Sequence, residues 1–431
     1  MTCFKGLASV LTGTLVAITA TVKADEAYTP TTSVAESRAM VAALPEADIW
    51  WTVPGDPMRW YNLNLPKIVP TATIYRDGPV RPLATAPNPA IGAFEVETPH
   101  GPMPFDAFLD SDQSTTMAVL ILHEGKIAFE RYPRQQPHDK PLFWSVTKAL
   151  VATVLAILED RGEVDVSQPV DHYLPALKDS AYAGVAVRDV LDMASGIDCA
   201  DDYEDQQSCY YRYSSSIGEG FRPPNSPDNP YDYIASLGPE QRWAEAGTGY
   251  SYSGVDTFVV GWLVEELTGM PFQDAFSDEV WRHLGAEGDA LIWAGRYGIP
   301  LTSGGFMSSV RDMGRFGLLF TPSRSVVTDR NIISDRYLKL IQEGGRPELR
   351  RRARGGDISN DDVLHNVYQW DAVYASGAFM KGGWAGQGLM IHPQKDLVAV
   401  WTGYFDEDWG QVSVEPMIRQ LWAALYPAPA D

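Results

Sequence analysis

The chain has 431 residues, of which 45% are hydrophobic and 21% are charged, and its formal net charge is −22. This length allows two or three domains, and the composition is that of an ordinary globular protein with a sizeable core. The negative charge argues against a binder of nucleic acid or anionic membranes, because attraction to phosphate needs clustered Lys and Arg.

The first 24 residues have the pattern of a secretory signal. Lys5 supplies the positive start, residues 6–22 are apolar and rich in small side chains, and Val22 and Ala24 place small residues before a cleavage site. We expect cleavage after Ala24 and a periplasmic or secreted bacterial protein. A retained membrane anchor is the alternative, although the apolar run is short for a ~20-residue span. No later segment is predicted to cross a membrane.

Residues 25–110 are rich in proline and have irregular apolar spacing, which predicts an extended wrapping segment rather than a domain. Two β-rich runs follow at 117–122 and 127–132, joined by His123-Glu124-Gly125-Lys126. This pattern predicts a β-hairpin.

Ser145-Val146-Thr147-Lys148 stands directly before an apolar run, residues 149–158, that predicts a buried helix. Side chains three residues apart lie on one helix face, and N–H groups at a helix N-terminus favour negative charge. A desolvated Lys148 would have a lowered pKa and could take the proton of Ser145. The alternative is an ordinary helix start with a solvated lysine.

Residues 150–320 are predicted to be mostly helical, with helices expected over 185–193, 254–267, 272–284 and 310–320. After signal removal, Cys199 and Cys209 are the remaining cysteines, ten residues apart in a polar loop. In an exported protein this predicts one disulfide. A metal site is not expected, because no His lies near these cysteines and the seven His are scattered.

The stretch Gly247 to Gly254 is a Gly- and Ser-rich loop that leads into a helix. Tyr252 on this loop could relay a proton if a lysine lay beside it. The alternative is a tyrosine packed in a turn.

Residues 322–362 are predicted to be loop-rich, followed by strands at 375–381, 389–392 and 397–404 and a closing helix at 412–425. Within this region, Lys381-Gly382-Gly383-Trp384 places glycines in a strand, which often marks close approach of a ligand. The N–H after the second glycine could form an oxyanion hole with the N–H of Ser145. A bulge or tight turn is the alternative. Strands at both ends with helices between them predict one sheet built from both ends of the chain.

These three elements, in this order, resemble the serine β-lactamase and penicillin-binding-protein superfamily. The tyrosine motif is similar to the class C-like branch, and the chain looks closest to the 6-aminohexanoate-dimer hydrolases and related esterases. Further similar stretches are Val190 to Ile197, Gly304 to Met313 and Gly377 to Gln387, with Trp50 and Trp51 in the proline-rich segment.

The resemblance implies an α/β (α+β) fold of the β-lactamase/transpeptidase type: an antiparallel sheet built from both ends of the chain, flanked by helices, with an inserted helical domain. It places this hydrolase domain at residues 111–425, with the helical subdomain at about 150–320.

The resemblance also implies roles for individual residues. Ser145 would be the acylated nucleophile and Lys148 its base, and Tyr252 would share protons with Lys148 and protonate the leaving group. The N–H groups of Ser145 and Trp384 would form the oxyanion hole, and no cofactor or metal is needed.

Lys381, Gly383 and Gly254 would border the substrate, and the chain departs from the family at two of these places. Gly254 stands where class C β-lactamases have an asparagine, and Lys381-Gly382-Gly383 lacks the hydroxyl of Lys-Thr-Gly. Both departures argue against efficient β-lactam hydrolysis and favour esters or linear amides. A D-Ala-D-Ala carboxypeptidase or β-lactamase, and a catalytically inactive binding protein on the same fold, remain alternatives. The sequence does not indicate an oligomeric state.

Overall fold

The structure is a computed structural model that describes residues 32–43, 53–219 and 222–427. The chain divides into two units, and all the described residues belong to the second, which begins at Thr31. The predicted signal, Trp50 and Trp51 lie outside the described residues. Within the described ranges, no helix is both long and apolar enough to span a membrane.

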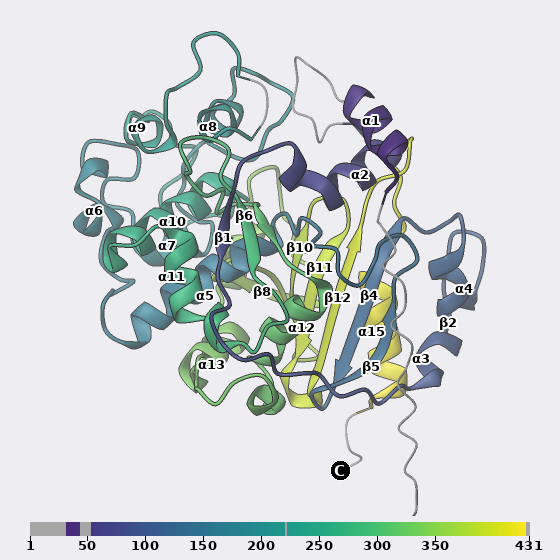
Figure 1. The fold of residues 1–431 in the computed structure, drawn as a ribbon. Coiled ribbons are helices and arrows are strands. Elements are labelled where there is room, and N and C mark those ends of the chain that lie inside the picture. Colours follow the sequence, from purple (N-terminus) through teal and green to yellow (C-terminus); the bar gives the residue numbers. More distant parts are fainter. Residues whose placement is uncertain (1–31, 44–52, 220–221, 428–431) are drawn as a thin grey trace, which may run out of the picture. The chain divides into compact units, whose positions relative to one another are not determined.

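The described residues form a seven-stranded antiparallel sheet in the order β5-β4-β12-β11-β10-β9-β8 (Figure 1). The strands are β4 Thr116–His123, β5 Lys126–Arg131, β8 Val363–Val367, β9 Trp370–Tyr374, β10 Phe379–Gly383, β11 Gln387–His392 and β12 Leu397–Gly403. β4 pairs with β12, so strands from the two sides of the helical region meet in the middle of the sheet. This arrangement confirms the predicted fold class.

Both faces of the central strands are buried, because helices cover the sheet on both sides (Figure 1). Alternate residues of β4 enter separate cores: Leu120 and Leu122 pack in the core that includes α5 and α12, whereas Val119 and Ile121 pack against α4 and α15. This is the period-two alternation of a strand. A strand buried on both faces is a continuous apolar run, which is why the hairpin could be predicted.

The helices fill the region between the two groups of strands and cover the sheet. They are α1 Val34–Ala43, α2 Asp56–Asn64, α3 Pro89–Ala93, α4 Phe105–Asp110, α5 Val146–Asp160, α6 Val170–Tyr173, α7 Val187–Leu191, α8 Cys209–Ile217, α9 Pro230–Ala235, α10 Gly254–Thr268, α11 Phe272–Glu279, α12 Val310–Leu318, α13 Asp335–Glu343, α14 Pro347–Arg351 and α15 Glu415–Leu425. Short 3₁₀ helices are η2 Leu65–Lys67, η3 Pro175–Leu177, η4 Trp281–His283, η5 Pro322–Val326 and η6 Pro393–Lys395.

The proline-rich segment is not simply extended, because it contains four short helices, α1 to α4, among its described residues. Its strand β1 Thr71–Ile74 pairs with β6 Ala290–Trp293, which pairs in turn with β7 Phe306–Met307. A smaller pair joins β2 Glu95–Val96 to β3 Met103–Pro104. Proline at the first turn of α2 and α3 starts these helices, since its missing N–H needs no partner there.

The region from 322 to 374 differs most from the sequence prediction. Helices α13 and α14 lie where loop was expected, and β8 and β9 were not predicted. α13 begins at Asp335 after the N-cap Ser334, whose side chain accepts from Tyr337 N–H, and its apolar face is Tyr337 and Ile341 with the partly buried Leu338 and Leu340. This short amphipathic helix was not predicted from the sequence. Residues 375–378, expected in a strand, instead form the turn between β9 and β10, where Gly377 has φ +91°.

Candidate active site

Ser145 is the N-cap residue of α5, and its side chain is partly exposed. The preceding residue, Trp144, has φ +48°, a backbone conformation that costs about 1–3 kcal/mol and persists only where neighbours fix it. Here Phe143 N–H donates to Phe306 O at 2.8 Å, and Trp144 Nε1 donates to Asn62 Oδ1 at 3.1 Å. These contacts fix the backbone that leads into Ser145.

Asn62, at the C-terminal part of α2, is a support that sequence reasoning missed. Its side chain is fully buried and its Nδ2 donates to Gly403 O at 3.3 Å, while its backbone oxygen accepts from Leu142 N–H at 2.8 Å. It therefore ties the proline-rich segment to the chain that enters Ser145 and to the end of β12. The one feature of the sequence that could have indicated this role is that Asn62 is a polar residue in a stretch of aromatic and apolar side chains.

Lys148 lies one turn into α5 and is 1% exposed. Its Nζ donates to Ser145 Oγ at 3.0 Å and to Ser303 O at 2.5 Å. Burial lowers the pKa of Lys148 to about 8, against the raising effect of nearby Asp201 and in concert with the lowering effect of Lys381. The ammonium is thus enclosed, and a substantial fraction is free amine near neutral pH.

Tyr252 lies on the loop before α10 and faces Ser145 from the other side. Its hydroxyl accepts from Lys381 Nζ at 3.0 Å, and the Ser145 hydroxyl lies near enough to lower the pKa of the phenol. Its ring lies between two ammonium groups, 5.1 Å from Lys148 Nζ and 4.6 Å from Lys381 Nζ. Burial, followed by Asp371 and Asp201, raises the pKa of Tyr252 well above its usual value. Tyr252 is therefore a protonated phenol at neutral pH.

Lys381 lies on β10 and is 0% exposed. Besides Tyr252, its Nζ contacts Asp371 Oδ1, and the other oxygen of Asp371 accepts from Gly382 N–H at 2.9 Å. The predicted contact of Lys381 with a substrate stays a prediction, and the contacts present are with Tyr252 and Asp371. Asp371 was missed because β9, which carries it, was not predicted.

Gly254 opens α10, and its N–H donates to Asp201 Oδ1 at 2.6 Å. A Cβ at this position would lie 2.9 Å from the Tyr210 ring and 3.2 Å from Asp201 Oδ1. The space next to Gly254 is therefore occupied by Asp201 and Tyr210. Burial raises the pKa of Asp201, while Lys148 lowers it. Sequence reasoning did not find Asp201, because an aspartate in an acidic loop has no distinctive pattern.

Gly383 is the last residue of β10, and a Cβ there would lie 2.4 Å from Phe143 O. Only glycine therefore lets this strand end approach the chain that enters Ser145. This approach supports an oxyanion hole made by the N–H groups of Ser145 and Trp384, which stays a prediction. The Trp384 ring packs on Phe405 at 5.1 Å between centroids and on Tyr203 at 6.2 Å.

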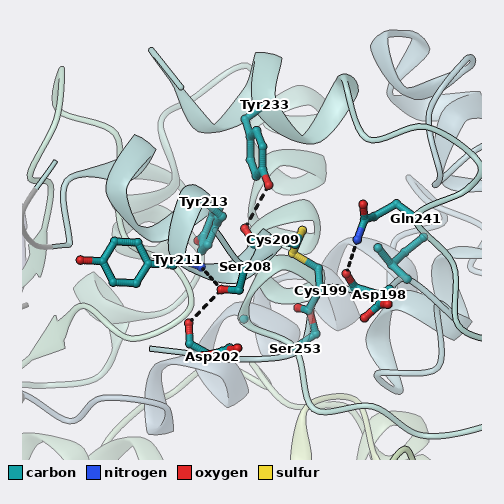
Figure 2. Close-up of a disulfide and its surroundings, with 12 residues drawn as sticks. Asp198, Cys199, Asp202, Ser208, Cys209, Tyr211, Tyr213, Tyr233, Gln241 and Ser253 are labelled. Atoms are coloured by element: carbon teal, nitrogen blue, oxygen red, sulfur yellow. Dashed lines mark hydrogen bonds between the residues drawn. A yellow bond between two sulfur atoms is a disulfide. The ribbon is translucent and has the colours of Figure 1, made fainter. Parts of the chain in front are cut away.

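A cavity of about 1160 Å³ is lined by residues that include Asp201, Tyr203 and Trp384, and Asp201 also accepts from Gly254 N–H at the start of α10. Its wall is the loop 198–209, which the predicted disulfide between Cys199 and Cys209 closes (Figure 2). Figure 2 also shows Ser208 Oγ donating to Asp202 O and Gln241 donating to Asp198 O, at 3.3 and 2.8 Å. Among the described residues, no group of three or more His, Cys, Asp or Glu is arranged to hold a metal ion.

Residues 105–403 match the sequence model of the protein family described as Beta-lactamase, and the chain belongs to this family. It is 29% identical over 361 residues to the 6-aminohexanoate-dimer hydrolase of Paenarthrobacter ureafaciens, covering 83% of this chain and 88% of that protein. The chain is a serine hydrolase.

Solved structures share its fold. A Bacillus anthracis protein assigned as a 6-aminohexanoate-dimer hydrolase superposes with a TM-score of 0.75 and 19% identity, covering 90% of this chain and 99% of that one. EstCE1, a hydrolase with promiscuous acyltransferase activity, superposes with a TM-score of 0.56 and 15% identity, covering 73% of this chain and 95% of that one.

Proposed function

We propose that this chain is an exported serine hydrolase that cleaves a linear amide or ester through an acyl-enzyme on Ser145. The observation that carries the proposal is the convergence of Lys148 and Tyr252 on Ser145: Lys148 Nζ lies 3.0 Å from Ser145 Oγ and 5.1 Å from the centroid of the Tyr252 ring, and the Ser145 hydroxyl lowers the pKa of the Tyr252 phenol. Ser145 and Lys148 lie on one turn of α5, whereas Tyr252 comes from a position more than a hundred residues further along the chain. Enclosure of a lysine beside a serine is the arrangement that activates such a nucleophile.

In the proposed reaction, Lys148 takes the proton of Ser145 as Oγ attacks the carbonyl carbon. With a pKa of about 8, roughly a tenth of Lys148 is free amine at pH 7. The phenol of Tyr252 gives a proton to the departing nitrogen or oxygen, and the Ser145 and Trp384 N–H groups bind the oxyanion. Water then attacks the acyl-enzyme, and the same groups act in reverse.

Two features support a linear amide or ester rather than a β-lactam as the substrate. Gly254 provides no side-chain amide, and the buried Lys381 ammonium is already engaged by Asp371 and the Tyr252 hydroxyl, which leaves it less available to a substrate carboxylate. The relative from Paenarthrobacter ureafaciens is named for hydrolysis of the 6-aminohexanoate dimer. The cavity beside Trp384 offers room for the remainder of an elongated substrate.

Export is supported by the signal-like N-terminal sequence together with the disulfide between Cys199 and Cys209. Disulfides persist in the periplasm and outside the cell and are rare in the cytosol. Fractionation of a bacterium that expresses the full chain, with mass spectrometry of the N-terminus, tests this part. A cytosolic protein that retains residues 1–24 would contradict it.

The catalytic part is tested with the chain from residue 25 onward and a panel of p-nitrophenyl esters, short ω-amino-acid amides and nitrocefin. We expect hydrolysis of esters or amides and covalent labelling by a serine-directed phosphonate. Ser145→Ala should lose both, whereas Ser167→Ala, on an exposed turn, should keep both. Turnover by Ser145→Ala would refute the assignment, and hydrolysis restricted to nitrocefin would favour a β-lactamase.

A further inference from the structure

Asp371 uses its two carboxylate oxygens for two different partners at the edge of the site. One oxygen contacts the buried Nζ of Lys381, and the other accepts from Gly382 N–H at 2.9 Å. Gly382 immediately precedes Gly383 and Trp384, the residues at the strand end beside Phe143. A single side chain therefore contacts both the lysine that touches Tyr252 and the strand end that carries the predicted oxyanion donor.

Lys381 depends on this carboxylate because its side chain is fully buried. Burial disfavours the ammonium form, and Asp371 opposes that effect both as a charge and as a hydrogen-bond acceptor. The Asp371 side chain itself is 31% exposed, so the pair lies at the boundary between solvent and the interior. Removal of one partner of such a pair leaves the other buried and uncompensated.

We propose that Asp371 is a positioning residue of the catalytic network, which holds Lys381 as an ammonium against the Tyr252 phenol and fixes the strand end at Gly382. This inference rests on the proposed function. An ammonium that donates to the phenol oxygen makes that oxygen hold its own proton less tightly, so Tyr252 becomes a better acid toward the leaving group.

The charge of Lys381 also affects Lys148, the proposed general base. The positive charge of Lys381 lowers the pKa of Lys148, and this effect is larger than the raising effect of Asp371 itself. If Asp371 is removed and Lys381 becomes neutral, the pKa of Lys148 rises. If Lys381 stays charged without Asp371, the pKa of Lys148 falls slightly. The direction in which the pKa of Lys148 shifts therefore reports whether Asp371 keeps Lys381 charged.

Other charged or titratable groups face the two lysines, and all of them are unchanged in the test. They are Asp201 in the loop 198–209, Glu219 after α8, Tyr250 and Tyr252 before α10, and Arg350 on α14, whose Nη1 lies 3.5 Å from Asp371 O.

The test measures kcat/KM against pH for p-nitrophenyl ester hydrolysis by wild type, Asp371→Asn, Lys381→Met, the double variant and Asp371→Glu. Asparagine keeps the shape of the side chain but removes its charge. On the acid side of the profile, kcat/KM rises with pH as Lys148 loses its proton, and we call this part of the curve the acid limb. We expect Asp371→Asn to lower kcat/KM by roughly 10- to 100-fold and to move the acid limb to higher pH. Lys381→Met should move it in the same direction. The control Asp362→Asn changes an exposed carboxylate that pairs with Arg419 at 3.6 Å, outside the site.

In the Lys381→Met background, Asp371→Asn should no longer raise the acid limb, because the charge it maintains is absent. Asp371→Glu should recover part of the wild-type profile. An acid limb that stays in place or moves to lower pH in Asp371→Asn would overturn the inference, as would equal effects of Asp371→Asn with and without Lys381. Phosphonate labelling of Ser145 in each variant distinguishes this failure from failure of the proposed function.

Discussion

Replacement of Lys148 by methionine should abolish turnover and also change how the stability of the protein depends on pH. The pKa of this lysine is about 8 in the folded chain and near 10.5 in an unfolded one. Below pH 8 both states carry the proton, so the folded state bears the full cost of a buried ammonium. Between pH 8 and 10.5 the unfolded state binds the proton more tightly, and stability therefore rises with pH.

The size of this effect follows from the two pKa values. The cost is roughly 3 kcal/mol at pH 7 and about 1.4 kcal/mol at pH 9.5, at ~1.4 kcal/mol for each pKa unit. The wild type should therefore gain about 2 kcal/mol more than Lys148→Met between these pH values. Loss of the hydrogen bond to Ser303 O costs the variant about 1–3 kcal/mol at every pH and does not affect this difference.

Urea unfolding at pH 7 and pH 9.5 measures the free energy of unfolding of each protein. Lys126→Met, which removes an exposed lysine at the start of β5, is the matched control and should parallel the wild type. Parallel behaviour of Lys148→Met and the wild type would show that Lys148 is solvated in the folded protein. The reasoning that makes it a general base would then be refuted.

Three further predictions concern groups around the nucleophile. Tyr252→Phe should lower kcat by roughly 10²- to 10⁴-fold, because a proton donor is lost, in a protein that still folds cooperatively; near-normal kcat would exclude Tyr252 as the acid. Reduction of the Cys199–Cys209 disulfide, which closes a loop with a sequence separation of 10, should lower the free energy of unfolding by about 2–4 kcal/mol. Urea unfolding with and without reductant checks this, and coincident curves would contradict it. Asn62→Ala should destabilise the fold by about 1–3 kcal/mol and reduce kcat, because the partners of a buried amide lose their hydrogen bonds; an unchanged kcat would show that Asn62 does not help to position Ser145.

The central strands and the Ser145 helix could be predicted because their apolar pattern is strong. α5 buries twelve of its fifteen residues, and α10 ends at Gly269, whose φ of +68° favours glycine. β8 has no such pattern, since His365 and Asn366 are buried in it beside Val367. His365 Nε2 is hydrogen-bonded to Ile341 O and Asn366 Nδ2 donates to Asp192 O, and a single sequence does not display such distant partners.

The same reason explains which parts of the site could be predicted. Ser145 and Lys148 are neighbours in the sequence, so their proximity follows from helix geometry alone. Asp201 and Asp371 reach the two lysines only through the tertiary fold. Their carboxylates compensate charges that the local sequence does not show as buried.

The hydrogen bonds of Asn62 have a consequence for any attempt to shorten this protein. The family match begins at residue 105, which suggests a natural place to truncate. A chain that started there would lack β1, the edge partner of β6, and would leave the Trp144 indole and the Leu142 amide without their acceptor. Such a fragment would contain every side chain proposed to be catalytic but would lack the contacts that position Ser145, so we expect the minimal active enzyme to include the helix α2.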